Sequence, residues 1–187
     1  TVPVVERDLA ESRRLLGEAG YFDGANGKPR LKLTLKTNTS TISVENARVI
    51  AAQMREAGVD IDHQANDWGI FYNDVKTGNT EVYMLRWVGV TDPRIYFEVF
   101  HSQEIGRNNR TRYSNPELDK LIEKGETILD KVARKKIYDE VQALVARDLP
   151  YIGLWYGKNV AVYRKELKNV RLHPSGKWAP LLEISKR

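Results

Sequence analysis

The chain has 187 residues, of which 41% are hydrophobic and 29% charged, a composition typical of a folded domain rather than of a disordered chain. It contains no cysteine, which excludes disulfides, thiolate nucleophiles, iron–sulfur clusters and cysteine-ligated zinc. The net charge of +5 is compatible with nucleic-acid binding, but acidic residues interleave with the basic ones. The densest basic run, residues 131–136, lies in a predicted helix and precedes Asp139 and Glu140. We therefore expect a solvated helix face and no nucleic-acid partner.

No apolar run approaches the ~20 residues that are needed to span a bilayer. Residues 1–18 lack the apolar core of a signal peptide, and the sequence does not begin with Met. We therefore expect a processed chain or a piece of a longer protein, with the size of one domain or one lobe.

The first elements are a helix and a strand. The helix follows Asp8, which forms a capping-box pattern with Glu11, and Gly20 is placed to end it. Residues 21–30 contain glycines and a proline and indicate a loop. Strict alternation then predicts a half-buried strand at residues 31–36.

A second helix and strand follow the polar turn of residues 37–41. Apolar residues at helical spacing predict a helix that ends at Gly58, and alternation predicts a strand at residues 59–63. His63 is expected on a face of this strand. Asp60 and Asp62 share a face of it, where we expect both carboxylates to be solvated.

A third pair begins at Asp67, which can cap a short helix that ends at Gly78. Residues 81–88 are apolar on both faces, which predicts a strand inside a sheet that is covered on both sides. The order strand–helix–strand–helix–strand favours right-handed crossovers and parallel pairing. The fold class is therefore α/β, with a mainly parallel sheet flanked by helices.

The second half of the sequence predicts mostly helices. Residues 95–100 suggest a helical turn, and residues 101–112 suggest a polar surface loop. Helices are expected after Asn115, with proline at the first helical position, and after Asp130. The residues expected to face inward are Leu118, Leu121, Ile122, Val132, Ile137, Val141, Leu144 and Val145.

Two strand-like runs, residues 151–156 and 159–163, flank Gly157 and Lys158 and predict a hairpin. We expect Trp155, in the first of these runs, to lie in the core. The residues beyond Glu166 are rich in basic side chains and show only short runs with the spacing of a helix or strand.

Motifs for cofactor chemistry are missing. The turn after the first strand has no glycine, so neither a dinucleotide-binding nor a P-loop pattern is present, and there is no GxSxG sequence. His63, His101 and His173 are far apart and show no metal-binding spacing. We expect no cofactor and no metal site.

The position of the strands indicates where a ligand would bind. In open α/β sheets the ligand lies outside the carboxyl ends of the strands, and the loops at residues 37–41, 66–68 and 87–92 occupy that edge. Two of these loops carry a tryptophan, a side chain with a large contact area. Trp68 is equally well explained as a packing residue, whereas for Trp87 we favour a ligand-facing position.

A small hydrolase- or transferase-like α/β enzyme is the alternative from a different class. Its nucleophile or base would have to come from the strand ends, where the candidates are Thr37, Ser40, Asp67 and Asp92. No histidine lies near them in the sequence. The pattern therefore favours a binding protein over an enzyme.

Several segments together resemble one protein family. They are AESRRLLGEAG at residues 10–20, ARVIAAQMREAGVDI at 47–61, RWVGVTDP at 86–93, NRTRYSNPELDKLI at 109–122 and IYDEVQALVARDLPYIGLWY at 137–156. In this order and spacing they resemble the C-terminal lobe of family 5 extracellular solute-binding proteins, the oligopeptide-, dipeptide- and nickel-binding components of ABC transporters. The resemblance covers nearly the whole chain.

The resemblance implies a periplasmic-binding-protein-like lobe at residues 1–164 and a tail at residues 165–187 that returns to an N-terminal lobe missing from this chain. It implies a periplasmic protein or a surface lipoprotein, without enzymatic activity. The implied partners are a small solute, such as a peptide, and an ABC permease of the inner membrane that the full-length protein serves.

The resemblance also implies site residues. Trp68, Trp87, Val88 and Gly89 match pocket-lining positions of peptide-binding members, some of which act through the backbone. Such members commonly carry an aspartate three residues after the strand-end tryptophan, which pairs with the α-amino group of the peptide. Val90 stands there in this chain, and Asp92 could substitute in part. The resemblance alone leaves open whether the solute is a peptide.

Overall fold

The computed structural model describes residues 6–21, 30–173 and 176–186. The first element is helix α1, Leu9–Glu18, where Asp8 accepts a hydrogen bond from the Glu11 amide at 2.9 Å. The capping box is incomplete because the Glu11 carboxylate binds Arg14 instead. Gly20 follows the helix with a φ of 88°, so the predicted start and end are confirmed. Most of the loop expected at residues 21–30 lies outside the described residues.

Three parallel strands form the sheet in the order β2-β1-β3. Strand β1, Leu31–Asn38, is central and pairs along its whole length with β2, Val59–Asn66. Strand β3, Val82–Tyr83, pairs with β1 at two positions only. Parallel pairing and the α/β class are therefore confirmed.

The prediction of a long buried strand at residues 81–88 is wrong, because β3 is a short edge strand. The second apolar face of this segment contacts a helical layer rather than the inside of the sheet. Tyr83 lies edge-on to Tyr151 with ring centroids 6.5 Å apart, and Trp87 packs against the helical core.

Helices cover both faces of the sheet. Helix α2, Thr41–Ala57, connects β1 to β2, and helix α3, Trp68–Thr77, connects β2 back across β1 to β3. Because the two right-handed crossovers run in opposite directions, the helices lie on opposite faces. Both end at left-handed glycines, Gly58 and Gly78, as predicted, although Asp67 makes no side-chain capping hydrogen bond.

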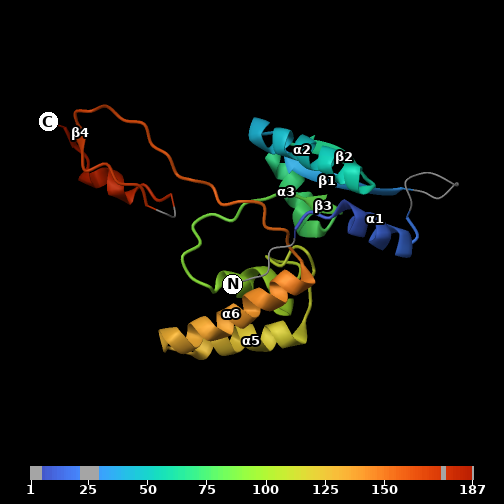
Figure 1. Ribbon diagram of the computed structural model, residues 1–187. Coiled ribbons are helices and arrows are strands. Elements are labelled where there is room, and N and C mark those ends of the chain that lie inside the picture. Colours follow the sequence, from blue (N-terminus) through green and yellow to red (C-terminus); the bar gives the residue numbers. More distant parts are fainter. Residues whose placement is uncertain (1–5, 22–29, 174–175, 187) are drawn as a thin grey trace.

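A helical unit follows the sheet. It comprises α4, Ile95–Phe100, and the neighbouring helices α5, Pro116–Thr127, and α6, Lys131–Asp148, which lie side by side (Figure 1). Asn115 caps α5 by accepting hydrogen bonds from two backbone amides. The core of this unit consists of Val99, Phe100, Leu118, Ile122, Tyr138, Val141 and Leu144.

Most residues expected to face inward do so, but Val132 is wrong, since its side chain is 67% exposed. It precedes Ile137 by five residues and therefore lies about 140° away from the buried face of the helix. The loop at residues 101–112 is not purely a surface loop either. His101 and Asn109 are buried, and the Asn109 amide donates to the carbonyl oxygens of Phe100, His101 and Tyr113 at 3.2, 3.1 and 2.7 Å.

The predicted hairpin at residues 151–163 is wrong. Residues 152–164 form no regular structure, and Trp155 is 62% exposed rather than in the core. An isolated hairpin needs a covering layer to be stable in water, and the described residues provide none there. The chain extends away from the rest of the molecule and ends in a small unit with β4, Leu167–Lys168, η3, Ala179–Glu183, and β5, Ser185–Lys186 (Figure 1).

Candidate functional site

The carboxyl ends of the three strands lie at one edge of the sheet. Asn38 at the end of β1 pairs with Asn66 at the end of β2, and Lys36 pairs with Tyr83 of β3. The chain passes from β1 to β2 on one side and then returns across β1 to β3 on the other side, so the direction of the connections changes at β1. In open α/β sheets, ligands bind at the carboxyl ends of the strands beside such a change of direction. The loops predicted from the sequence as ligand-binding therefore surround one candidate edge.

Four side chains form a continuous row at this edge, and we call Trp68, Tyr72, Arg110 and Trp87 the aromatic row. The rings of Trp68 and Tyr72 stack with centroids 5.2 Å apart and an angle of 13° between their planes. The Arg110 guanidinium carbon lies 5.0 Å from the Tyr72 ring centroid and 4.6 Å from that of Trp87. The row links the two tryptophans that were singled out in the sequence.

Trp68 fits both a ligand-facing and a packing position, because it is 54% exposed and also packs edge-on against the buried Phe71. Trp87 is half-buried. The sequence analysis missed the other two members of the row. Tyr72 could have been found from its position one helical turn after Trp68, whereas no sequence signal places Arg110 beside them.

The segment after β3 has exposed backbone. Val88 is 69% exposed and Val90 is 46% exposed, and Gly89 has a φ of 72° with open space around its α-carbon. Among the described residues, no backbone–backbone hydrogen bond involves residues 85–91. The peptide groups beside Trp87 are therefore free to bond to another extended chain.

Asp92 has partners within the protein. Its carboxylate accepts hydrogen bonds from Arg134 of α6 and from the Arg94 amide at 2.8 Å. The hydrogen bonds from Arg134 are the largest of the causes that lower the pKa of Asp92 to about 2. Asp92 therefore fastens the end of the exposed segment to the helical unit.

A polar network holds α3 against the sheet. The Lys36 ammonium group lies 2.8 Å from the Asp74 carboxylate and donates to the Asn79 carbonyl oxygen at 2.7 Å, with Lys36 and Asp74 side chains mostly buried. Hydrogen bonding by Lys36 lowers the pKa of Asp74. The alternation of residues 31–36 did not predict that Lys36 would form a buried ion pair.

The structure also brings together a hydroxyl and an imidazole that are distant in the sequence. Thr37 Oγ1 lies 2.8 Å from His63 Nε2. Burial, followed by the charge of Arg48, lowers the pKa of His63, so the ring is neutral at pH 7. The Thr37 side chain is completely buried, and a substrate could not reach it.

The strand carboxylates differ in their surroundings. Asp62 is exposed and accepts a hydrogen bond from Gln64, in agreement with the expectation of a solvated group. Asp60 is instead half-buried and lies 3.1 Å from Arg30 Nε, so the expectation was wrong for this residue. Across the described part of the chain, no three His, Asp or Glu side chains cluster as metal ligands, and no helix is long and apolar enough to cross a membrane.

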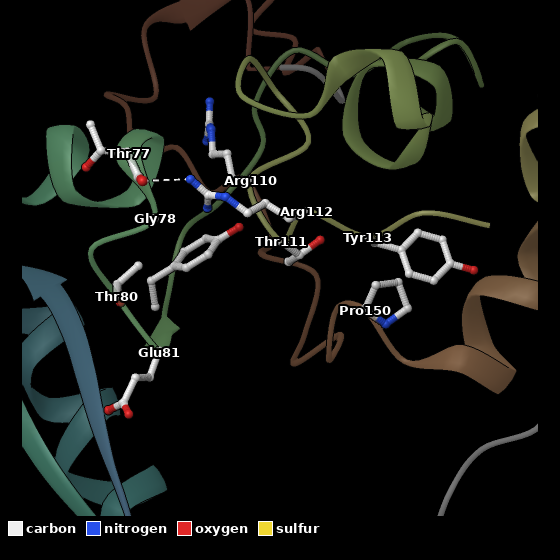
Figure 2. Close-up of a pocket in the computed structure, with 10 residues that line it drawn as sticks. Thr77, Gly78, Thr80, Glu81, Arg110, Thr111, Arg112, Tyr113 and Pro150 are labelled. Carbon is white, nitrogen blue, oxygen red and sulfur yellow. Dashed lines mark hydrogen bonds between the residues drawn. The ribbon is translucent and has the colours of Figure 1, made fainter.

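A pocket of about 580 Å³ lies between the sheet and the helical unit (Figure 2). It is lined by Thr77, Gly78, Thr80, Glu81, Tyr83, Arg110, Thr111, Arg112, Tyr113 and Pro150. None of the site residues predicted from the sequence lines it. Two of its charged side chains make hydrogen bonds within the protein: Arg112 donates to the Thr77 carbonyl oxygen, and Glu81 accepts from the Thr34 amide. We therefore place the candidate site at the carboxyl edge of the strands.

Comparison with known proteins identifies relatives of this chain. The oligopeptide-binding protein AppA of Bacillus subtilis is 28% identical over 184 residues, which cover 92% of this chain and 34% of AppA. The periplasmic murein peptide-binding protein MppA of Escherichia coli is 29% identical over 161 residues, which cover 85% of this chain and 29% of MppA. The chain thus spans about a third of the length of these curated relatives.

Solved structures agree. The structure of AppA from Bacillus subtilis in complex with a nonapeptide matches with a TM-score of 0.86 and 25% identity, over 100% of this chain and 39% of that chain. The Escherichia coli murein tripeptide-binding protein MppA matches with a TM-score of 0.67 and 30% identity, over 76% of this chain and 27% of that chain. The family model described as bacterial extracellular solute-binding proteins, family 5 Middle, matches residues 1–107. Because this match covers more than half of the sequence, the chain belongs to the family 5 extracellular solute-binding proteins.

Proposed function

We propose that this chain is a ligand-binding lobe of a solute-binding protein that captures peptides for import by an ABC transporter. The observation that carries the proposal is the backbone of residues 85–91, which includes Trp87, lies at the carboxyl edge of a parallel sheet and makes no backbone–backbone hydrogen bond among the described residues. Main-chain hydrogen bonds give affinity for an extended peptide of any sequence, and a neighbouring aromatic ring adds apolar contact. The names of the relatives AppA and MppA support a peptide as the solute.

Charge recognition of the peptide amino terminus is not supplied by this segment. Position 90 is a valine, and the carboxylate of Asp92 is bound by Arg134. We therefore expect main-chain bonding and contact with Trp87 and Trp68 to dominate, with Val88 and Gly89 acting through their backbone groups.

The proposal includes a second lobe. Residues 1–164 would form the lobe described here and residues 165–187 a tail that returns to the other lobe. The exposed side chains of Ile152, Trp155, Val160 and Val162 support this arrangement, since they require a cover in water. The full-length protein would act outside the cytoplasmic membrane, deliver its solute to a permease, and have no enzymatic activity.

A binding experiment on the full-length protein tests this function. Native mass spectrometry and calorimetry with a pool of synthetic peptides of two to nine residues should detect saturable binding. Trp87→Ala should weaken binding by at least tenfold, because it removes contact area at the centre of the site. The control is Val132→Ala, since Val132 is 67% exposed and lies on helix α6. Absence of binding to every peptide would overturn the proposal.

This chain alone should bind peptides weakly or not measurably, because one lobe offers only part of the contacts and no closure around the ligand. Calorimetry on the isolated 187-residue chain measures this. Tight, saturable binding by the lone lobe would contradict the two-lobe arrangement while leaving the peptide specificity intact.

A further inference from the structure

Arg110 is the charged member of the aromatic row, and its guanidinium forms no ion pair with a carboxylate of the described residues. The structure describes three half-buried arginines, and two of them, Arg30 and Arg134, each bind an aspartate. No carboxylate of the described residues lies within 4.0 Å of Arg110. A partly desolvated guanidinium without an anion is energetically unfavourable, and aromatic faces compensate only part of that cost.

The guanidinium is also fixed in position. It lies beside the rings of Tyr72 and Trp87, and its Nη2 group donates to the Tyr72 hydroxyl at 3.1 Å. The preceding residue, Asn109, anchors the backbone through its three hydrogen bonds to carbonyl oxygens. A cation held in this way loses little further freedom when an anion binds.

Two donor groups of Arg110 have no hydrogen-bond partner among the described residues. Its Nε–H is buried and has no hydrogen-bond partner in the described chain. Its Nη1 group also has none among the described residues and is not fully buried, and Arg110 lines the pocket shown in Figure 2. Figure 2 shows the two neighbouring arginines pointing in different directions, with Arg112 reaching the Thr77 carbonyl oxygen and Arg110 pointing away from it. Of the two, Arg110 is the one with a buried donor group that has no partner among the described residues.

We propose that Arg110 binds a carboxylate of the captured solute, so that this lobe selects peptides by a negative charge next to the ring of Trp87. A guanidinium fork matches the geometry of a carboxylate, and the partly buried setting strengthens the interaction relative to water. The inference depends on the peptide-binding function proposed above and adds a charge requirement to it. The carboxylate is either the carboxyl terminus of the peptide or an acidic side chain.

The test uses the full-length protein and the peptide Ala-Ala-Val-Ala in matched forms. One form has a free carboxyl terminus and a second has a carboxyl-terminal amide. Two further peptides are amidated and carry either Glu or Gln at the third position. Calorimetry should show that one charged form binds at least tenfold more tightly than its neutral partner, and the identity of that pair assigns the carboxylate. The preference should fall as salt is raised.

The variants separate recognition from structure. Arg110→Gln should abolish the preference for the charged form, so that the ratio of the two affinities falls to about one. Arg110→Lys should keep part of the preference, because the charge remains but the planar fork is lost. Arg112→Gln is the matched control and should keep the full preference. A thermal melt confirms that each variant is folded.

Four other outcomes are informative. Equal affinity of the wild-type protein for charged and neutral forms would overturn the role of Arg110 and leave the peptide-binding function standing. A preference that survives in Arg110→Gln would also overturn it, and so would equal loss of both affinities, which indicates a purely structural role. Failure of all four peptides, together with the peptide pool above, would overturn both proposals.

Discussion

Both terminal nitrogens of Arg134 bind the carboxylate of Asp92, at 2.9 and 2.8 Å. The two residues connect the loop that follows the sheet to helix α6. Arg134 also donates from Nε to the Gly125 carbonyl oxygen of α5 at 3.1 Å, so one side chain ties three parts of the chain together. The exposed backbone beside Trp87 is thereby anchored at its carboxyl-terminal end.

Acid should release this anchor. The pKa of Asp92 is lowered from its ordinary value of 3.8 to about 2, so the ion pair contributes its full stability above pH 3.8 and loses it as the pH falls toward 2. A carboxyl-detected NMR titration should give a value near 2 for this residue. In Arg134→Gln the pKa should return toward 3.8. An unshifted value in the wild-type protein would show that the pair does not form in solution.

Removing the anchor should affect binding more than stability. Asp92→Asn is expected to lower the Tm by a few degrees, because the pair is partly exposed, and to weaken peptide binding by loosening residues 85–91. Calorimetry on the full-length protein measures the second effect. Asp139→Asn is the control, since it breaks an exposed pair with Lys135 on the same helix and should change neither property.

Asn109 should be essential for the helical unit. Its buried amide satisfies three carbonyl oxygens, so Asn109→Ala should lower the free energy of unfolding by about 3 kcal/mol. Asn109→Asp should be worse, because a carboxylate would face the same oxygens. Urea denaturation measures both. Asn79→Ala is a useful comparison, since Asn79 lies between α3 and β3 and its side chain makes a single hydrogen bond, to Asp74.

A side chain at Gly78 should displace Arg112. Its φ is 78°, and a β-carbon there would lie 2.0 Å from Nη1 of Arg112. Gly78→Ala should therefore destabilise the protein by about 1–2 kcal/mol, because the left-handed backbone is strained and the exposed Arg112 side chain must move away from the Thr77 carbonyl oxygen. Gly20 has a similar φ, but a β-carbon there would have no atom within 4 Å. Gly20→Ala should therefore cost only the backbone strain of about 1 kcal/mol.

A double variant isolates the contact. Arg112→Ala removes the clashing group, so adding it to Gly78→Ala should restore the part of the loss that Gly20→Ala does not show. If Gly78→Ala and Gly20→Ala cost the same, the contact between Gly78 and Arg112 is absent in solution.

The backbone of Val88 should matter more than its side chain. Val88→Pro removes the amide hydrogen that we expect a bound peptide to use, and should reduce affinity at least tenfold. Val88→Ala keeps the amide and should change affinity less than threefold, since the side chain is 69% exposed. Equal effects of the two substitutions would argue against main-chain recognition at this position.

The sequence predicted local features better than long-range ones. The starts and ends of the first helices followed from Asp8, Gly20, Gly58 and Gly78, because caps and left-handed turns depend on a few neighbouring residues. The length of β3 did not follow, because the apolar residues that predict a buried strand pack equally well against helices.

The same limit applies to the candidate site. Trp68 and Trp87 could be selected from their positions after strands, whereas Arg110 joins them only through the fold. The buried pair of Lys36 and Asp74 was hidden because alternation assigns Lys36 to the solvent side of its strand. Helix α3 covers that side, and only the crossover topology shows it.

The aromatic row has a spectroscopic consequence. The sequence has four tryptophans, of which Trp155 and Trp178 are 62% and 78% exposed in the carboxyl-terminal part of the chain. Replacing these two with phenylalanine would leave Trp68 and Trp87 as the emitting groups of this chain. A solute that displaces water from the row would move their emission to shorter wavelength, so the binding edge carries its own fluorophores and its occupancy could be followed without a label.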